Sequence, residues 1–208
     1  MFSLQTIFGK GDKFYGLLEQ SAEQAVLSAR ALQAIVAGGK SQDVPEFAAL
    51  HQREKVLAAE ISESLVNTFV TALDREDIEE LSSALYRIPK TIQKFAERYV
   101  VVGEHLRGID FGPRVELLVS ATEAVADMVG ELRNGLHITR VRKTQGRLQA
   151  IESEADRLLL EPYRTLYLES DDAIRVMLAK DLFELIEKAV DKCRDVGNVV
   201  YGIVLKNS

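Results

Sequence analysis

The chain has 208 residues, of which 47% are hydrophobic and 28% charged, and its formal net charge at pH 7 is -6. This balance indicates a soluble globular protein with a sizeable core, and the negative charge disfavours nucleic acid as the main partner. The single cysteine, Cys193, excludes an intramolecular disulfide, and the absence of an apolar run of about 18 to 20 residues excludes a predicted membrane span.

Nearly the whole chain shows helical periodicity, and we find no segment with the alternation of a half-buried strand. Capping residues, Gly and Pro divide this pattern into six segments, so we predict an all-α protein. The predicted helices run from Lys13 to Val36, from the Asp43 cap to Leu73, from the Asp74 cap to Leu106, from Pro113 to about Gly135, from His137 to Leu168 and from the Ser170 cap to Lys206.

The two halves of the chain resemble each other. At an offset of 101 positions, Leu57 of the second predicted helix aligns with Leu158 of the fifth, and Leu81 of the third aligns with Leu182 of the sixth, without a gap. The first and fourth helices align at an offset of 100. We therefore predict two pseudo-repeated three-helix bundles, residues 1–108 and 109–208, packed as one compact domain.

Two pairs of acidic residues in the second half have a spacing that suggests a metal site. Glu152 and Asp156 lie on the fifth predicted helix, and Glu187 and Asp191 lie on the sixth. Residues four apart share one face of a helix. Glu152 precedes Ser170 by about as many residues as Glu187 follows it, so the two pairs should lie level on antiparallel helices.

Four converging carboxylates repel one another unless a cation lies among them. Oxygen ligands alone favour a hard divalent or trivalent ion, such as magnesium, manganese, calcium or iron. No histidine has the ferritin-like E-x-x-H spacing, which disfavours a di-iron oxidase. The alternative is that these acids are solvated, or pair with Arg157, Lys188 or Lys192.

The equivalent positions in the first half lack these acids. At the same offset, His51, Lys55, Tyr86 and Lys90 replace Glu152, Asp156, Glu187 and Asp191, respectively. A charged lysine is not a metal ligand, so we expect no second metal site. With Arg87, these residues form either a basic patch for an anion or a partner, or ordinary solvated positions.

A second basic segment, "LHITRVRKTQGR", begins the fifth predicted helix. It contains four cationic residues: Arg140, Arg142, Lys143 and Arg147. One interpretation is a contact with phospholipid head groups, phosphate or an acidic partner. The other is the solvated face of a long helix.

Three segments of the chain resemble the PhoU-like proteins, specifically the phosphate transport regulators or accessory proteins of the Pit phosphate transporter. They are "TFVTALDREDIEEL" (Thr68 to Leu81), "IESEADRL" (Ile151 to Leu158) and "LFELIEKAVDKCRDVGNVVYGIVLK" (Leu182 to Lys206). The first is close to the family's F-x-T-P-x-D-R-E-D-I signature, with Ala72 where Pro is usual.

The resemblance implies a fold of two pseudo-repeated three-helix bundles, with metal ligands at the two E-x-x-x-D motifs. We therefore expect a non-catalytic regulator that docks to a Pit-type phosphate permease from the cytoplasm, at the inner face of the cell membrane. A homo-oligomer is left open. A metal-dependent hydrolase of phosphate esters and a purely structural helical scaffold are the alternatives.

Overall fold

The structure, a computed structural model, describes residues 4–38, 44–135, 137–169 and 171–207, and these contain helices and no strands. The predicted all-α class and the six long helices are confirmed in this part of the chain. The α-helices are α1 (Leu4–Val36), α2 (Val44–Val66), α3 (Arg75–Val102), α4 (Gly112–Arg133), α5 (Ile138–Glu169) and α6 (Ala173–Lys206), and a 3-10 helix, η2 (Gly103–Leu106), follows α3.

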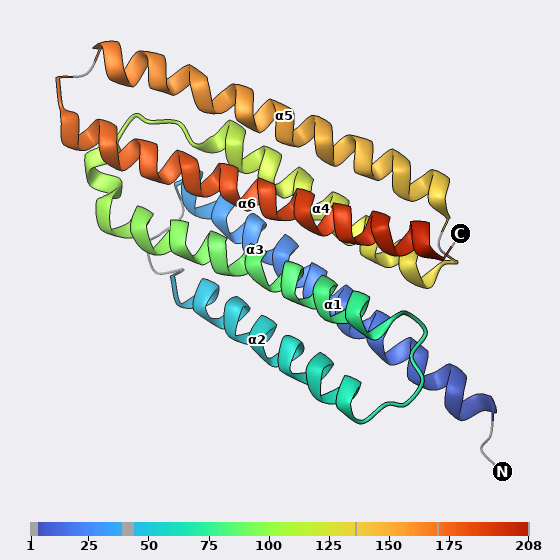
Figure 1. Cartoon of the computed structure of the whole chain (residues 1–208). Helices are drawn as coiled ribbons and strands as arrows, with labels where there is room; N and C mark the ends of the chain where they lie inside the picture. Colours follow the sequence, from blue (N-terminus) through green and yellow to red (C-terminus); the bar gives the residue numbers. More distant parts are fainter. Residues whose placement is uncertain (1–3, 39–43, 136, 170, 208) are drawn as a thin grey trace.

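The helices lie side by side in an elongated bundle, with α2 and α5 along opposite edges (Figure 1). Helices α1, α2 and α3 all pack against one another, and so do α4, α5 and α6. The two groups meet where α1 packs on α4 and α3 packs on α6. The first three helices thus have the same neighbour relations as the last three, while the duplication and its boundaries stay predictions.

One hydrophobic core joins the two groups, because the buried apolar side chains of all six long helices form a single cluster. At one point of this core three aromatic rings meet: Phe111, just before α4, lies 5.7 Å from Phe95 of α3 and 4.6 Å from Phe183 of α6, between ring centroids. Each phenyl ring removed from water contributes about 1.5–3 kcal/mol. Cys193 is fully buried in the same core.

Glycines end several of the helices. Gly108 and Gly135, after η2 and α4, have φ angles of 86° and 101°, which side chains other than glycine's rarely adopt. At the start of α6 the cap is Asp172, whose Oδ1 accepts a hydrogen bond from the backbone N–H of Arg175 at 3.0 Å. The predicted cap, Ser170, lies outside the described residues.

Three predicted helix boundaries were wrong. Helix α1 begins at Leu4 and not at Lys13, because the two glycines before Lys13 cost only about 1 kcal/mol each in a helix and no proline interrupts it. Helix α2 ends at Val66 and not at Leu73, and the last turn before Leu106 is 3-10. Asp74 does occupy the N-cap position of α3, but its side chain makes no capping hydrogen bond.

None of the helices in the described part of the chain combines the length and the apolarity that crossing a bilayer requires.

Candidate functional site

The acidic pairs lie on facing sides of α5 and α6, which pack against each other and run antiparallel (Figure 1). Arg194 of α6 links one acid from each helix. Its Nη1 donates a hydrogen bond to Oε1 of Glu152 and lies 3.3 Å from Oδ1 of Asp191. The guanidinium thus bridges the two helices at this level of the bundle.

The other end of the acidic group is centred on Glu187. The pKa of this carboxyl is raised to about 7, mainly by burial and also by the negative charges of Asp191 and Asp156 and a hydrogen bond with Asp191. Glu187 therefore faces Asp156 across the two helices, one turn from where Arg194 joins Glu152 to Asp191. The two pairs are level, as the spacing predicted.

These side chains are of the type that binds a hard cation, but they are not arranged around a common point. All four donors are carboxylates, and Glu187 and Asp156 form no ion pair with a described residue. However, no three His, Cys, Asp or Glu side chains are arranged to hold a metal ion within the described residues. An ion between Glu152 and Asp191 has to displace Arg194, and binding by Asp156, Glu187 and Asp191 requires their side chains to rearrange. Metal binding stays a prediction.

Arg194 was missing from the residues singled out in the sequence. The available signal was its position three residues after Asp191, a spacing at which oppositely charged side chains meet on a helix. Two of the three alternative partners named from the sequence pair elsewhere: Arg157 with Glu154 at 2.6 Å and Lys192 with Asp195 at 2.6 Å. Lys188 forms no ion pair within the described residues.

The counterpart positions in the first half also come together, between α2 and α3. The ring of His51 lies 5.3 Å from that of Tyr86, between centroids, and Nζ of Lys90 lies 5.5 Å from the centroid of the Tyr86 ring. Nδ1 of His51 is 2.6 Å from Oε1 of Gln93, and the pKa of His51 is lowered, mainly by burial and also by the charges of Lys55 and Lys90. Anion or partner binding by this group stays a prediction.

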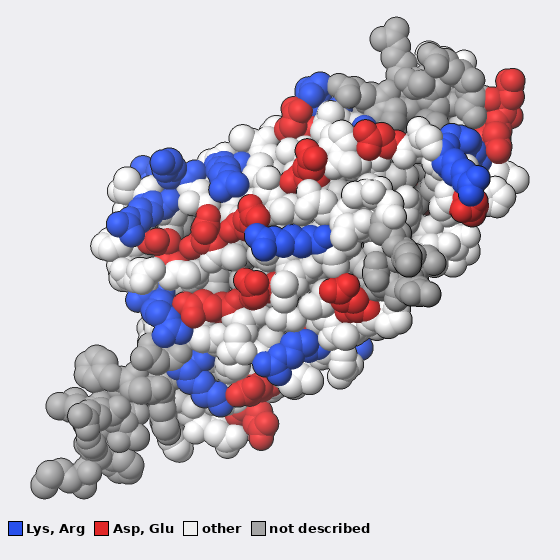
Figure 2. Space-filling view, turned by 180° about the vertical axis from the view of Figure 1, so that it is seen from behind, with Lys and Arg blue, Asp and Glu red and all other residues white. Residues whose placement is uncertain are grey.

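The basic segment at the start of α5 is exposed. Nη1 of Arg140 lies 3.5 Å from Oε1 of Glu131. Arg142, Lys143 and Arg147 form no ion pair within the described residues. Figure 2 shows basic side chains interspersed with acidic ones on the face that it presents. Mixed charge of this kind is typical of a solvated surface, and the predicted anion or partner contact remains untested.

A buried carboxyl in the first half was not predicted. Glu54 of α2 is inaccessible to solvent, and its Oε1 accepts a hydrogen bond from the hydroxyl of Ser21 of α1. Its other oxygen, Oε2, has no hydrogen-bond partner among the residues that the structure describes. Burial raises the pKa of Glu54 to about 7, while the bond from Ser21 acts in the opposite direction. The sequence signal was weak, because the contact depends on how α1 packs on α2.

Comparison with known proteins identifies relatives over nearly the full length. The chain is 22% identical over 212 residues to a protein of Rhizobium meliloti (strain 1021) named as a candidate Pit accessory protein, with 94% of each chain covered. It is 22% identical over 149 residues to UPF0111 protein YkaA of Bacillus subtilis (strain 168), covering 69% of this chain and 70% of the relative. No family model matches the chain.

Solved structures share the arrangement of helices. A PhoU-like protein from Shewanella oneidensis MR-1 superposes with a TM-score of 0.81 at 18% identity, covering 92% of this chain and 99% of that one. A candidate PhoU-like phosphate regulatory protein from the same organism gives 0.79 at 17% identity, covering 93% and 99%. The chain therefore has the PhoU-like fold, and its resemblance to the PhoU-like Pit accessory proteins, first indicated by three sequence segments, is confirmed.

Proposed function

We propose that the chain is a non-catalytic accessory protein that regulates inorganic phosphate transport by binding a Pit-type permease at the cytoplasmic face of the membrane. The observation that carries this proposal is the similarity to a candidate Pit accessory protein over 94% of both chains, which involves the whole fold and not a single motif. The PhoU-like fold of the two Shewanella structures supports the same assignment.

The proposed mechanism is docking through the faces and ends of a rigid helical bundle. A single core shared by all six long helices makes the bundle a unit whose surface keeps its shape. Binding to the permease would then change the transport rate by favouring one conformation of the permease, which requires a higher affinity for that conformation than for the others.

We further propose that a hard divalent cation binds the acidic group of α5 and α6. Its ligands are Asp156, Glu187 and Asp191, and when bound it supplies positive charge that holds the two helices together. The support is the mutual repulsion that contributes to the raised pKa of Glu187. Arg194 already supplies positive charge at Glu152 and Asp191, so we expect the ion to be weakly held and to compete with this guanidinium.

Coexpression with a Pit-type permease tests the regulatory role. The tagged chain should copurify with the permease from mild detergent, and an unrelated helical bundle with the same tag should not. Failure to copurify, with both proteins folded and abundant, contradicts the proposal.

An assay of phosphate-ester hydrolysis with Mn²⁺ tests the non-catalytic part, because turnover that disappears in Glu187→Gln indicates an enzyme.

A further inference from the structure

The last residue of α2 and the connection to α3 expose three large apolar side chains. The relative exposures of Val66, Phe69 and Val70 are 81%, 101% and 61%. Single exposed apolar residues are common, but phenylalanine is among the residues most often buried. Three such side chains within five consecutive positions form an apolar tip at one end of the bundle. A group of this kind often marks an interaction surface.

Hydrogen bonds hold this apolar tip in a defined shape. The guanidinium of Arg75 donates to the backbone carbonyl of Leu65 and, at 2.6 Å, to that of Thr68, which ends α2 and secures the connection to α3. The Thr71 hydroxyl donates to the carbonyl of Leu73 at 2.6 Å, and the Leu73 side chain is buried. Phe69 is therefore exposed in a connection that hydrogen bonds hold in place. A surface whose shape is already set loses little conformational entropy on binding.

The segment around the apolar tip carries a large negative charge. Residues 60–80 contain seven acidic residues and one basic residue, and two of the acids, Glu60 and the buried Asp77, pair with Lys13 and Lys206 from outside the segment. The one basic residue, Arg75, is committed to the two backbone carbonyls. Within the described residues, Glu63, Glu76 and Glu79 are exposed and form no ion pair.

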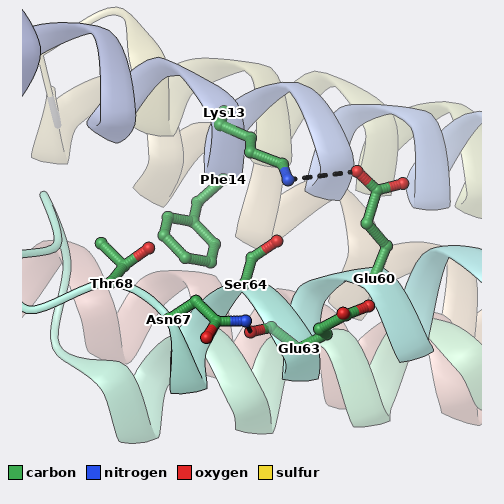
Figure 3. Close-up of a pocket in the computed structure, with 7 residues that line it drawn as sticks. All are labelled: Lys13, Phe14, Glu60, Glu63, Ser64, Asn67 and Thr68. Carbon is green, nitrogen blue, oxygen red and sulfur yellow. Dashed lines mark hydrogen bonds and ion pairs between the residues drawn. The ribbon is translucent and has the colours of Figure 1, made fainter.

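These acids lie on both sides of the connection. On one side, Glu60 and Glu63 line a hollow of about 530 Å³ together with Asn67 and Thr68, and Glu60 forms an ion pair with Lys13 at 3.3 Å (Figure 3). On the other side, Glu76 and Glu79 line a hollow of about 400 Å³ together with Val66. The apolar side chains thus project from a surface with carboxylates on two flanks.

We propose that the apolar tip and its flanking acids dock onto a cytoplasmic loop of the membrane transporter that is rich in Lys and Arg. This inference rests on the proposed function and assigns the surface that performs it. Cytoplasmic loops of membrane proteins carry an excess of Lys and Arg, which complements the exposed carboxylates of Glu63, Glu76 and Glu79. The inner leaflet of the membrane is anionic and repels the same surface, so the charge favours a protein partner over a lipid one.

Binding to a Pit-type permease in zwitterionic nanodiscs tests the surface. Phe69→Ser removes an exposed ring whose burial is worth about 10- to 100-fold in affinity. Glu76→Lys with Glu79→Lys reverses charge on one flank without touching the ring. The matched control is Val101→Ser, which removes a side chain with a relative exposure of 80% near the opposite end of α3. Thermal melting of all variants checks that they are folded.

We expect the wild type and Val101→Ser to bind with equal affinity, and both the Phe69 variant and the double charge variant to bind at least about ten-fold more weakly. If the wild type binds and these variants bind equally well, the docking surface is elsewhere and the proposed function stands. Equal binding of the wild type to permease-free anionic nanodiscs overturns the protein partner in favour of lipid. If the wild type does not bind the permease at all, the proposed function and this inference both fail.

Discussion

Replacing Glu54 with glutamine should remove a pH dependence from the stability of the bundle. Glu54 is fully buried between α1 and α2, with the Ser21 hydroxyl bonded to one carboxyl oxygen and, within the described part of the chain, no partner on the other. Glutamine has nearly the same shape and is uncharged at every pH. At the predicted repeat offsets, Ser21 and Glu54 align with the buried Ala121 and Ala155, so the second half builds these positions without an ionisable group.

The magnitude follows from the pKa. Burial raises the pKa of Glu54 from 4.5 to about 7 in the folded protein, so between these values the folded state holds a proton that the unfolded state has lost. The contribution of Glu54 to the free energy of unfolding is therefore fully present below pH 4.5 and is lost as the pH rises through about 7. Each unit of pKa difference corresponds to about 1.4 kcal/mol, so the wild type should lose about 3 kcal/mol across this range.

Urea denaturation of both proteins between pH 4.5 and 8 gives the free energy of unfolding at each pH. The amide of glutamine can change the free energy of unfolding by the same amount at every pH. The quantity to follow is therefore the free energy of unfolding of Glu54→Gln minus that of the wild type, as a function of pH. It should rise by about 3 kcal/mol in favour of the variant as the pH increases. The control Glu63→Gln, at an exposed position of the same helix, should show no such trend. If the free-energy difference between Glu54→Gln and the wild type stays constant or falls as the pH rises, the pKa of Glu54 is not raised by burial.

Three further variants test other parts of the structure. Arg194→Gln should lower the free energy of unfolding by about 1 kcal/mol in urea at low salt, and should make added Mg²⁺ or Mn²⁺ more stabilising than in the wild type; an unchanged ion response contradicts competition at the acidic group. Arg75→Ala should speed amide hydrogen exchange at the end of α2 and cost about 1–2 kcal/mol, because two carbonyls lose a donor; unchanged exchange means that the guanidinium does not end the helix. Lys206→Ala should lower the urea midpoint, because Nζ of Lys206 donates to the buried carboxylate of Asp77; an unchanged midpoint shows that Asp77 has another source of compensation.

The parts of the fold that depend on local pattern could be predicted from the sequence. Helical periodicity, glycines and prolines determined the number and order of the long helices, and the count of residues about the α5–α6 connection placed the two acidic pairs at about the same level. The count put Glu187 level with Glu152, whereas Glu152 lies near Asp191, about one helical turn away. Such inferences need only the rise per residue and the antiparallel packing of neighbours. The end of α6 at Lys206 was also correct, because the hydrophobic pattern continues to that point.

The parts that depend on long side chains reaching across helices could not be predicted. Arg194 is on the same helix as Asp191, but its contact with Glu152 depends on the packing of α5 against α6. The early end of α2 depends on Arg75, which follows it in the chain and reaches back to its last carbonyls. The contact between Glu54 and Ser21 likewise depends on the packing of α2 against α1.

We propose that this chain acts on phosphate uptake through a transporter. The most direct measurement is the initial rate of radiolabelled phosphate uptake by cells whose only phosphate transporter is a Pit-type permease, with and without the chain at matched permease levels. We expect a clear change in rate that Phe69→Ser abolishes and Val101→Ser preserves. An identical rate in the presence and absence of the wild-type chain would contradict it.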